Sequence, residues 1–136
     1  IWPRYTNPKI SKNIIFNHLY LDFDEDIILT EGVFDAIKAG RNSVPLLGTT
    51  LVENSKLFKE IVRSGTSVYL ALDLDAKKKT NKLIKLFLKY DIEVYSIDTL
   101  PYSDVGEMTH KEFIARKDCA DVLTLDNYLL NRIRGI

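Results

Sequence analysis

Acidic residues follow two apolar segments of the chain in a pattern that suits metal-dependent chemistry. The segment 26–30 is followed by Glu31, and the segment 67–72 is followed by Asp73 and Asp75. An ionised carboxylate at the end of a buried strand is costly to desolvate, so it usually has a partner or a metal. Residues two positions apart on extended backbone project to the same side. We therefore expect Asp73 and Asp75 to aim at one point, with Glu31 facing them.

This set of ligands favours a hard divalent cation. Carboxylate oxygens without nearby histidine or cysteine suit Mg²⁺ or Mn²⁺ better than zinc. Such ions take further ligands from substrate phosphates, which indicates phosphoryl or nucleotidyl transfer, or phosphodiester cleavage. The alternative is that these acids are solvated loop ends or first-turn helix residues, which are common for dipole reasons alone.

The elements that must position these acids alternate between strand and helix. Short apolar runs predict strands, and apolar residues recurring at three and four positions predict helices. Capping-box spacing at 50–53 and at 109–112 marks two helix starts. This order predicts an α/β fold with a mostly parallel sheet and helices on both faces, after an irregular N-terminal segment. The expected strands are 26–30, 44–47, 67–72 and 93–97, and the expected helices include 33–39, one ending at Gly65, one ending near Tyr90 and 127–134.

Composition limits the possible classes of protein. A chain of 136 residues with 46% hydrophobic and 28% charged residues is long enough for one folded domain. Formal net charge is zero, so a nucleic acid would need a local basic patch. The single cysteine excludes an internal disulfide, and no apolar run approaches the ~20 residues of a membrane span. We expect a cytoplasmic protein, and the start at Ile1 suggests a piece of a longer chain.

Several motifs together resemble the TOPRIM domain of bacterial-type DNA primases. Glu31-Gly32-Val33-Phe34-Asp35, followed some forty residues later by Asp73-Leu74-Asp75, is similar to the motif pair of the TOPRIM fold. The primase branch is indicated by further similar stretches, which are Arg4-Tyr5-Thr6-Asn7-Pro8, Ile15-Phe16-Asn17, Leu19-Tyr20, Leu47-Gly48-Thr49-Thr50-Leu51, Leu100-Pro101 and Asp104-Val105-Gly106-Glu107.

The resemblance implies a domain division and a function. It implies a remnant of the primase N-terminal subdomain at 1–25, a TOPRIM domain at 26–118 and a helical segment at 119–136. The implied activity is that of a DNA-directed RNA polymerase, which joins ribonucleotides into an RNA primer on a single-stranded DNA template. The implied partners are those nucleic acids and a replicative helicase bound through other parts of the chain, with no membrane.

The resemblance also implies roles for particular residues. Glu31 matches the catalytic acid, which is a metal ligand or proton carrier, and Asp73 and Asp75 match the metal pair. Other matches are the supporting acids Asp35 and Asp104, the glycine Gly32 that lets backbone approach phosphates, and the groove residues Arg4 and Asn7. The position of Lys77 and Lys78 directly behind the metal pair makes them candidates for binding phosphates, whereas Lys85 and Lys89 are interpreted as a solvated helix face.

The sequence departs from the primase pattern at several positions. Leu74 stands between the two aspartates where primases usually have glycine, Lys77 replaces a following glycine, and Gly106 replaces an aspartate. These changes suggest a divergent branch of the bacteriophage type. They leave two alternatives open, a TOPRIM-type metal-dependent nuclease and a non-catalytic module that binds single-stranded DNA or a replisome partner.

Overall fold

The computed structural model describes residues 20–48, 51–102 and 104–133 of the chain. Strands and helices alternate along them, as the sequence predicts. The elements, in chain order, are β1 (Ile27–Thr30), α1 (Val33–Ala39), β2 (Ser43–Pro45), α2 (Lys56–Ser64), β3 (Val68–Ala71), the 3-10 helix η2 (Leu74–Ala76), α3 (Lys77–Lys89), β4 (Val94–Ser96), the 3-10 helix η3 (Val105–Glu107), α4 (His110–Asp118), β5 (Val122–Leu123) and α5 (Leu125–Ile133).

The strands form one five-stranded sheet in the order β2-β1-β3-β4-β5. Neighbours are parallel from β2 to β4, and β5 pairs with β4 in the antiparallel direction. The chain leaves β1 for β2 on one side and then returns to β3 on the other side, so the strand order reverses at β1. Thr30 lies opposite Ala71, which brings the carboxyl ends of β1 and β3 together. In open parallel sheets, ligands bind at such a reversal point.

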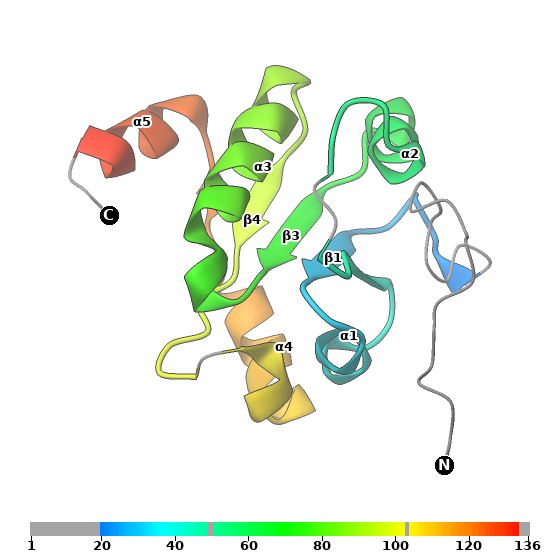
Figure 1. Cartoon of the computed structure of the whole chain (residues 1–136), viewed down its shortest axis with the longest axis vertical. Helices are drawn as coiled ribbons and strands as arrows, with labels where there is room; N and C mark the ends of the chain where they lie inside the picture. Colours follow the sequence, from blue (N-terminus) through cyan, green and yellow to red (C-terminus); the bar gives the residue numbers. More distant parts are fainter. Residues whose placement is uncertain (1–19, 49–50, 103, 134–136) are drawn as a thin grey trace, which may run out of the picture.

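Helices cover both faces of the sheet (Figure 1). Ile27 and Leu29 join an apolar cluster with α2 and α3, while Ile28 joins a second cluster with α1 and α4. Because side chains alternate between faces along a strand, β1 is buried on both sides, as its continuous apolar run predicts. The predicted α/β class, with a mostly parallel sheet and helices on both faces, is confirmed and is consistent with a TOPRIM-like fold.

Two helices begin where local sequence signals place them. The helix α1 spans the predicted 33–39, and Gly40 follows it at a φ of 96°. The helix α4 starts with the predicted capping box, in which the Thr109 hydroxyl accepts from the Glu112 N–H at 3.1 Å. The Glu112 carboxylate accepts from the Thr109 N–H in return, at 3.4 Å. These caps satisfy backbone groups that a helix leaves free at its ends.

The predicted capping box at 50–53 is wrong, because α2 begins only after Ser55. Thr50 lies outside the described residues. The side chain of Leu51 is buried, and this anchors the chain in the core before the helix starts. Glu53 binds the hydroxyl and ammonium groups of two side chains at the end of α3 instead of capping α2. Tertiary contacts therefore outweigh the local signal here.

Three smaller differences concern strand and helix ends. The strand β2 covers Ser43–Pro45 where the sequence predicts 44–47, because the chain turns at Leu47 with a φ of 56°. The edge strand β5 was not predicted, since two residues give no periodic signal. The helix α5 begins at Leu125, ahead of the predicted 127. The domain boundaries at 25 and 118 stay predictions.

The described residues contain no helix that is both long enough and apolar enough to cross a membrane.

Candidate metal centre

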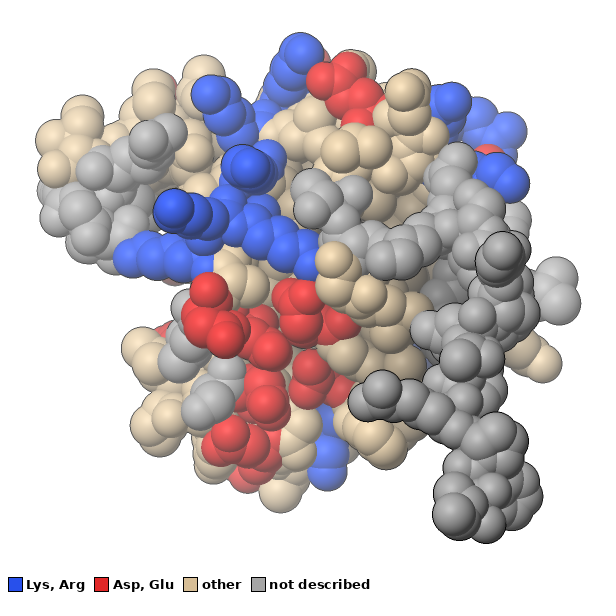
Figure 2. Space-filling model, in the orientation of Figure 1, with Lys and Arg blue, Asp and Glu red and all other residues tan. Residues whose placement is uncertain are grey.

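Three carboxylates from separate parts of the chain converge at the carboxyl edge of the sheet. One oxygen each of Asp35, Asp73 and Asp104 lies within 4.8 Å of the other two. We call these residues the aspartate triad. Asp35 comes from the first turn of α1, Asp73 from the segment after β3, and Asp104 from the residue before η3. Acidic side chains form a patch on the face of the molecule shown in Figure 2.

Asp35 is held in place by two backbone amides. Its side chain is largely buried, with 9% of the residue exposed. The Gly32 N–H donates to Oδ2 at 3.2 Å, and the Gly106 N–H donates to Oδ1 at 2.9 Å. These donors come from the turn before α1 and from η3, so Asp35 ties the two segments together. Each oxygen keeps a lone pair that can still contact a cation.

Gly106 fits closely against the triad. A Cβ atom at this position would lie 3.0 Å from Asp35 Oδ1 and 3.2 Å from Asp104 Oδ1. A side chain here would therefore crowd two of the three carboxylates. Asp104 itself accepts from the Glu107 N–H at 3.2 Å, which fixes its position at the start of η3. The departure from the primase pattern at Gly106 is thus matched by a close backbone approach to Asp35.

Asp73 lies among several other carboxylates. Its Oδ1 atom is buried and has no hydrogen-bond partner among the described residues. Desolvation first, and then the negative charges of Asp35, Asp104, Glu31 and Asp75, raise the pKa of Asp73 to about 6. No ion pair within the described part of the chain reaches Asp73. The geometry and chemistry of the triad therefore fit a divalent cation with oxygen ligands.

Glu31 lies beside the triad, paired with a lysine from α3. Lys79 Nζ is 2.9 Å from Glu31 Oε1, and the two side chains are only 18% and 23% exposed. The other oxygen, Oε2, is buried without a hydrogen-bond partner in the described part of the chain. Glu31 thus has one oxygen anchored by a fixed cation and one oxygen available for a proton or a ligand.

Asp75 does not join the triad. We predicted that extended backbone would place Asp73 and Asp75 on the same side, and this premise is wrong. The chain turns into η2 directly after Asp73, and Asp75 is exposed. Its role as a metal ligand stays a prediction.

The predicted nucleic-acid-binding residues lie in different parts of the chain, and two of them fall outside the described residues. Lys77 and Lys78 begin α3 and are exposed. Gly32 precedes α1 and contributes the amide to Asp35. Arg4 and Asn7 lie outside the described residues.

Sequence reasoning missed two partners of the acids. Lys79 stands off the lysine stripe of α3, on the side next to the buried Leu83, and this displacement is a signal that its side chain turns inward. The bond from the Gly106 amide to Asp35 joins residues 71 positions apart. No local pattern could have indicated that contact.

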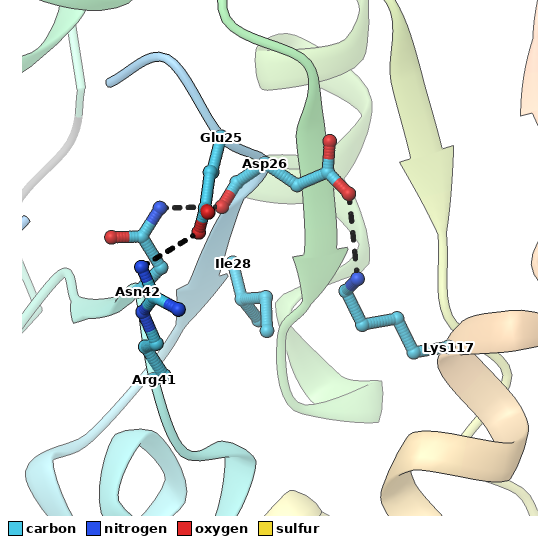
Figure 3. Close-up of a pocket in the computed structure, with 6 residues that line it drawn as sticks. All are labelled: Glu25, Asp26, Ile28, Arg41, Asn42 and Lys117. Atoms are coloured by element: carbon cyan, nitrogen blue, oxygen red, sulfur yellow. Dashed lines mark hydrogen bonds and ion pairs between the residues drawn. The ribbon is translucent and has the colours of Figure 1, made fainter. Parts of the chain in front are cut away.

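A pocket lies at the opposite, amino edge of the sheet (Figure 3). Its volume is about 280 Å³, and its lining includes Glu25, Arg41 and Asn42. We call it the amino-edge pocket. Its charged groups are paired across the opening, by Arg41 with Glu25 at 3.1 Å and by Lys117 with Asp26 at 3.5 Å. The Asn42 amide group is fully engaged by backbone atoms of the segment before β1.

Comparison with solved structures relates this fold to a primase. The chain is similar to the crystal structure of the zinc-binding and RNA polymerase domains of the Aquifex aeolicus primase. The TM-score is 0.59 and the sequence identity is 28%, over 71% of this chain and 26% of that chain. A search against models of protein families finds no match, and a search of curated proteins finds none.

The chain therefore has a primase-related fold, and it spans about a quarter of the length of that primase structure. The acidic cluster at the sheet edge, together with this neighbour, supports metal binding.

Proposed function

We propose that this chain is the catalytic TOPRIM part of a DNA primase of the bacteriophage type. It would contribute metal-dependent nucleotidyl transfer to the synthesis of short RNA primers on single-stranded DNA. The observation that carries the proposal is the aspartate triad, with the buried and unpartnered Asp73 Oδ1, at the carboxyl edge of a primase-related fold. In a longer protein, further parts would choose the template and bind the replicative helicase.

The aspartate triad would hold Mg²⁺ or Mn²⁺ through one oxygen of each residue. When bound, the ion would neutralise charge that develops on the phosphate oxygens during transfer. Asp35 contributes a ligand whose position is fixed by the Gly32 and Gly106 amides. Asp73 contributes Oδ1, which has no hydrogen-bond partner among the residues that the structure describes. A site assembled before substrate arrives loses little free energy in reorganising.

Glu31 would act on the proton of the attacking hydroxyl. The 3′ hydroxyl of the primer must lose its proton as it attacks the α-phosphate of the incoming ribonucleotide. Glu31 Oε2 is unpartnered and lies beside the triad, so it is suited to accept that proton. The ion pair with Lys79 orients the carboxylate through its other oxygen. Gly32, Lys77 and Lys78 are candidates for the phosphates of the nucleotide, and Arg4 and Asn7 for the template.

The test separates primer synthesis from the nuclease alternative. The 136-residue chain is incubated with Mn²⁺, a single-stranded template and labelled ribonucleotides, and then with labelled DNA and Mn²⁺ alone. We expect dinucleotide formation in the first reaction, weak in this isolated part, and no cleavage in the second. DNA cleavage in the absence of nucleotides would contradict the proposal and indicate the nuclease alternative instead.

Two variants give the test its control. Asp73→Asn should abolish both Mn²⁺ binding and dinucleotide formation. Asp91→Asn changes the same charge in the exposed turn after α3 and should leave both unchanged. Dinucleotide formation that survives Asp73→Asn would contradict the metal mechanism. Mn²⁺ binding without any nucleotide transfer by the longer protein would support the non-catalytic alternative.

A further inference from the structure

The outer face of α3 carries three lysines that have no charged partner among the described residues. Lys78, Lys82 and Lys85 follow one another at spacings of four and three residues and are exposed. We call these three residues the lysine track. Among the described residues, none of them forms an ion pair or donates a side-chain hydrogen bond to a carboxylate. Helical geometry places them on the side opposite the buried apolar residues of α3.

The other lysines of α3 show that pairing is available on this helix. Lys79 turns inward to Glu31, and Lys89 contacts Glu53 at 3.4 Å. From the sequence, Lys85 and Lys89 are interpreted together as a solvated helix face. The structure distinguishes them, because Lys89 has an ion-pair partner and Lys85 has none among the described residues. Unpaired cations in a row repel one another, so the track is a place where positive charge remains uncompensated.

The track begins five residues after Asp73 in the chain. The helix α3 starts directly after η2, which follows Asp73. Figure 2 shows basic side chains gathered over the region of α3, bordering the acidic patch. The eight residues from Lys78 to Lys85 span roughly 10 Å along the helix axis. That length is enough for the track to contact more than one phosphate group of a bound strand.

We propose that the lysine track binds the phosphate backbone of a single-stranded nucleic acid next to the metal centre. This inference rests on the proposed function, because it extends the path of the strand beyond the reacting phosphate. Lysines act as point charges and carry no base-reading geometry, so this contact is independent of sequence. The partner is a polyanion that must reach a phosphate-transfer site, which favours a nucleic acid strand over an acidic protein.

The experiment measures the salt dependence of binding. Fluorescence anisotropy follows a labelled oligodeoxythymidine of about 12 nucleotides, a length within the range that single-strand-binding domains cover. The variant Lys82→Gln/Lys85→Gln removes two track charges without touching the aspartate triad. Each phosphate contact contributes about −0.7 to the slope of log K against log salt for single strands, so the slope should become less steep by about 1.4. The wild type should then lose about sevenfold more affinity than the variant between 50 and 200 mM salt.

A matched variant and a second ligand complete the design. Lys59→Gln/Lys111→Gln removes the same charge from exposed positions on α2 and α4 and should leave the slope unchanged. Equal slopes for the track variant and the wild type would overturn the proposal. So would tighter binding of a polyglutamate peptide than of the oligonucleotide, since this would indicate an acidic protein partner.

Mn²⁺ binding is measured on the same samples to keep the two proposals distinct. The track variant should bind Mn²⁺ as the wild type does. Absence of Mn²⁺ binding by the wild type would contradict the proposed function. A salt slope that is the same in the track variant and the wild type would contradict only this inference.

Discussion

At the amino edge of the sheet, Glu25 and Asp26 each have a cationic partner, Arg41 at 3.1 Å and Lys117 at 3.5 Å. At the carboxyl edge, the aspartate triad has no such partner among the described residues, and within that part of the chain one of its oxygens is buried without a hydrogen bond. The two edges belong to the same strands. What differs is whether the negative charge is balanced within the described part of the chain.

This difference separates stability from function in physical terms. Paired charges and satisfied amides at the amino edge lower the free energy of the folded chain, though exposed pairs contribute little. Crowded carboxylates at the carboxyl edge raise it unless a cation binds. Proteins commonly retain such unfavourable arrangements where a ligand relieves them. Changes at the carboxyl edge should therefore affect metal affinity, and changes at the amino edge should affect folding.

The largest expected effect is on metal affinity. Asp73→Asn removes a negative charge and one ligand oxygen from the triad, and we expect Mn²⁺ affinity to fall by at least ~100-fold. Loss of outer-shell partners alone costs roughly 10–100-fold in metal sites. Isothermal titration calorimetry measures the change. Asp26→Asn, at the amino edge, is the control and should bind Mn²⁺ normally. Comparable losses in both variants would mean that the edges do not differ as described.

The next effect is on folding, through a buried amide at the amino edge. Asn42 is 8% exposed, donates to the carbonyls of Asp22 and Asp26 at 2.8 Å, and accepts from the Asp22 N–H at 2.8 Å. Asn42→Ala loses these bonds and places alanine, which tolerates left-handed backbone less well than asparagine, at a φ of 62°. We expect a loss of about 2–4 kcal/mol in the free energy of unfolding, from urea titration.

Two further measurements sharpen that prediction. Asn42→Gly relaxes the left-handed backbone and should be about 1 kcal/mol less destabilising than Asn42→Ala. Mn²⁺ affinity should stay unchanged in both variants wherever they remain folded. A drop in affinity would show that the amino edge also shapes the triad.

A smaller effect concerns pH. In the folded chain the pKa of Asp73 is raised from an ordinary value near 3.8 to about 6. The folded state therefore holds this proton more tightly, and stability contributed by Asp73 rises as the pH falls from 7 toward 4. Asp73→Asn removes the penalty, so the variant should melt at a higher temperature than the metal-free wild type at pH 7. The difference should shrink toward pH 4, and a difference that is independent of pH would contradict this assignment.

Local patterns were sufficient to predict most elements of the fold. An apolar run placed β3, the position between Gly32 and the cap residue Gly40 placed α1, and the box at Thr109 and Glu112 placed the start of α4. These signals depend on residues within one or two turns. The predicted box at 50–53 failed because the burial of Leu51, a tertiary contact, decided where α2 begins.

The candidate site could be predicted in its residues but not in its grouping. Asp35, Asp73 and Asp104 were all candidates. The prediction nevertheless grouped Asp75 with Asp73, because it took the backbone after β3 to be extended. The turn into η2 could not be seen, since three residues of 3-10 helix give no periodic signal. The ion pair between Lys79 and Glu31 joins residues 48 positions apart, so the inward position of Lys79 on the helix could not name its partner.

The smallest expected effect tests whether the two edges are independent. Lys117 lies 3.5 Å from Asp26 and 4.3 Å from the ring centroid of Tyr69. Lys117→Met keeps the length of the side chain and removes its charge, and we expect a loss of about 1 kcal/mol or less in urea titration. Lys117→Arg should recover most of this loss. Since the pair lies at the amino edge, Mn²⁺ affinity should not change, and a loss above roughly 2 kcal/mol with weaker Mn²⁺ binding would show that charge balance at one edge sets the geometry of the other.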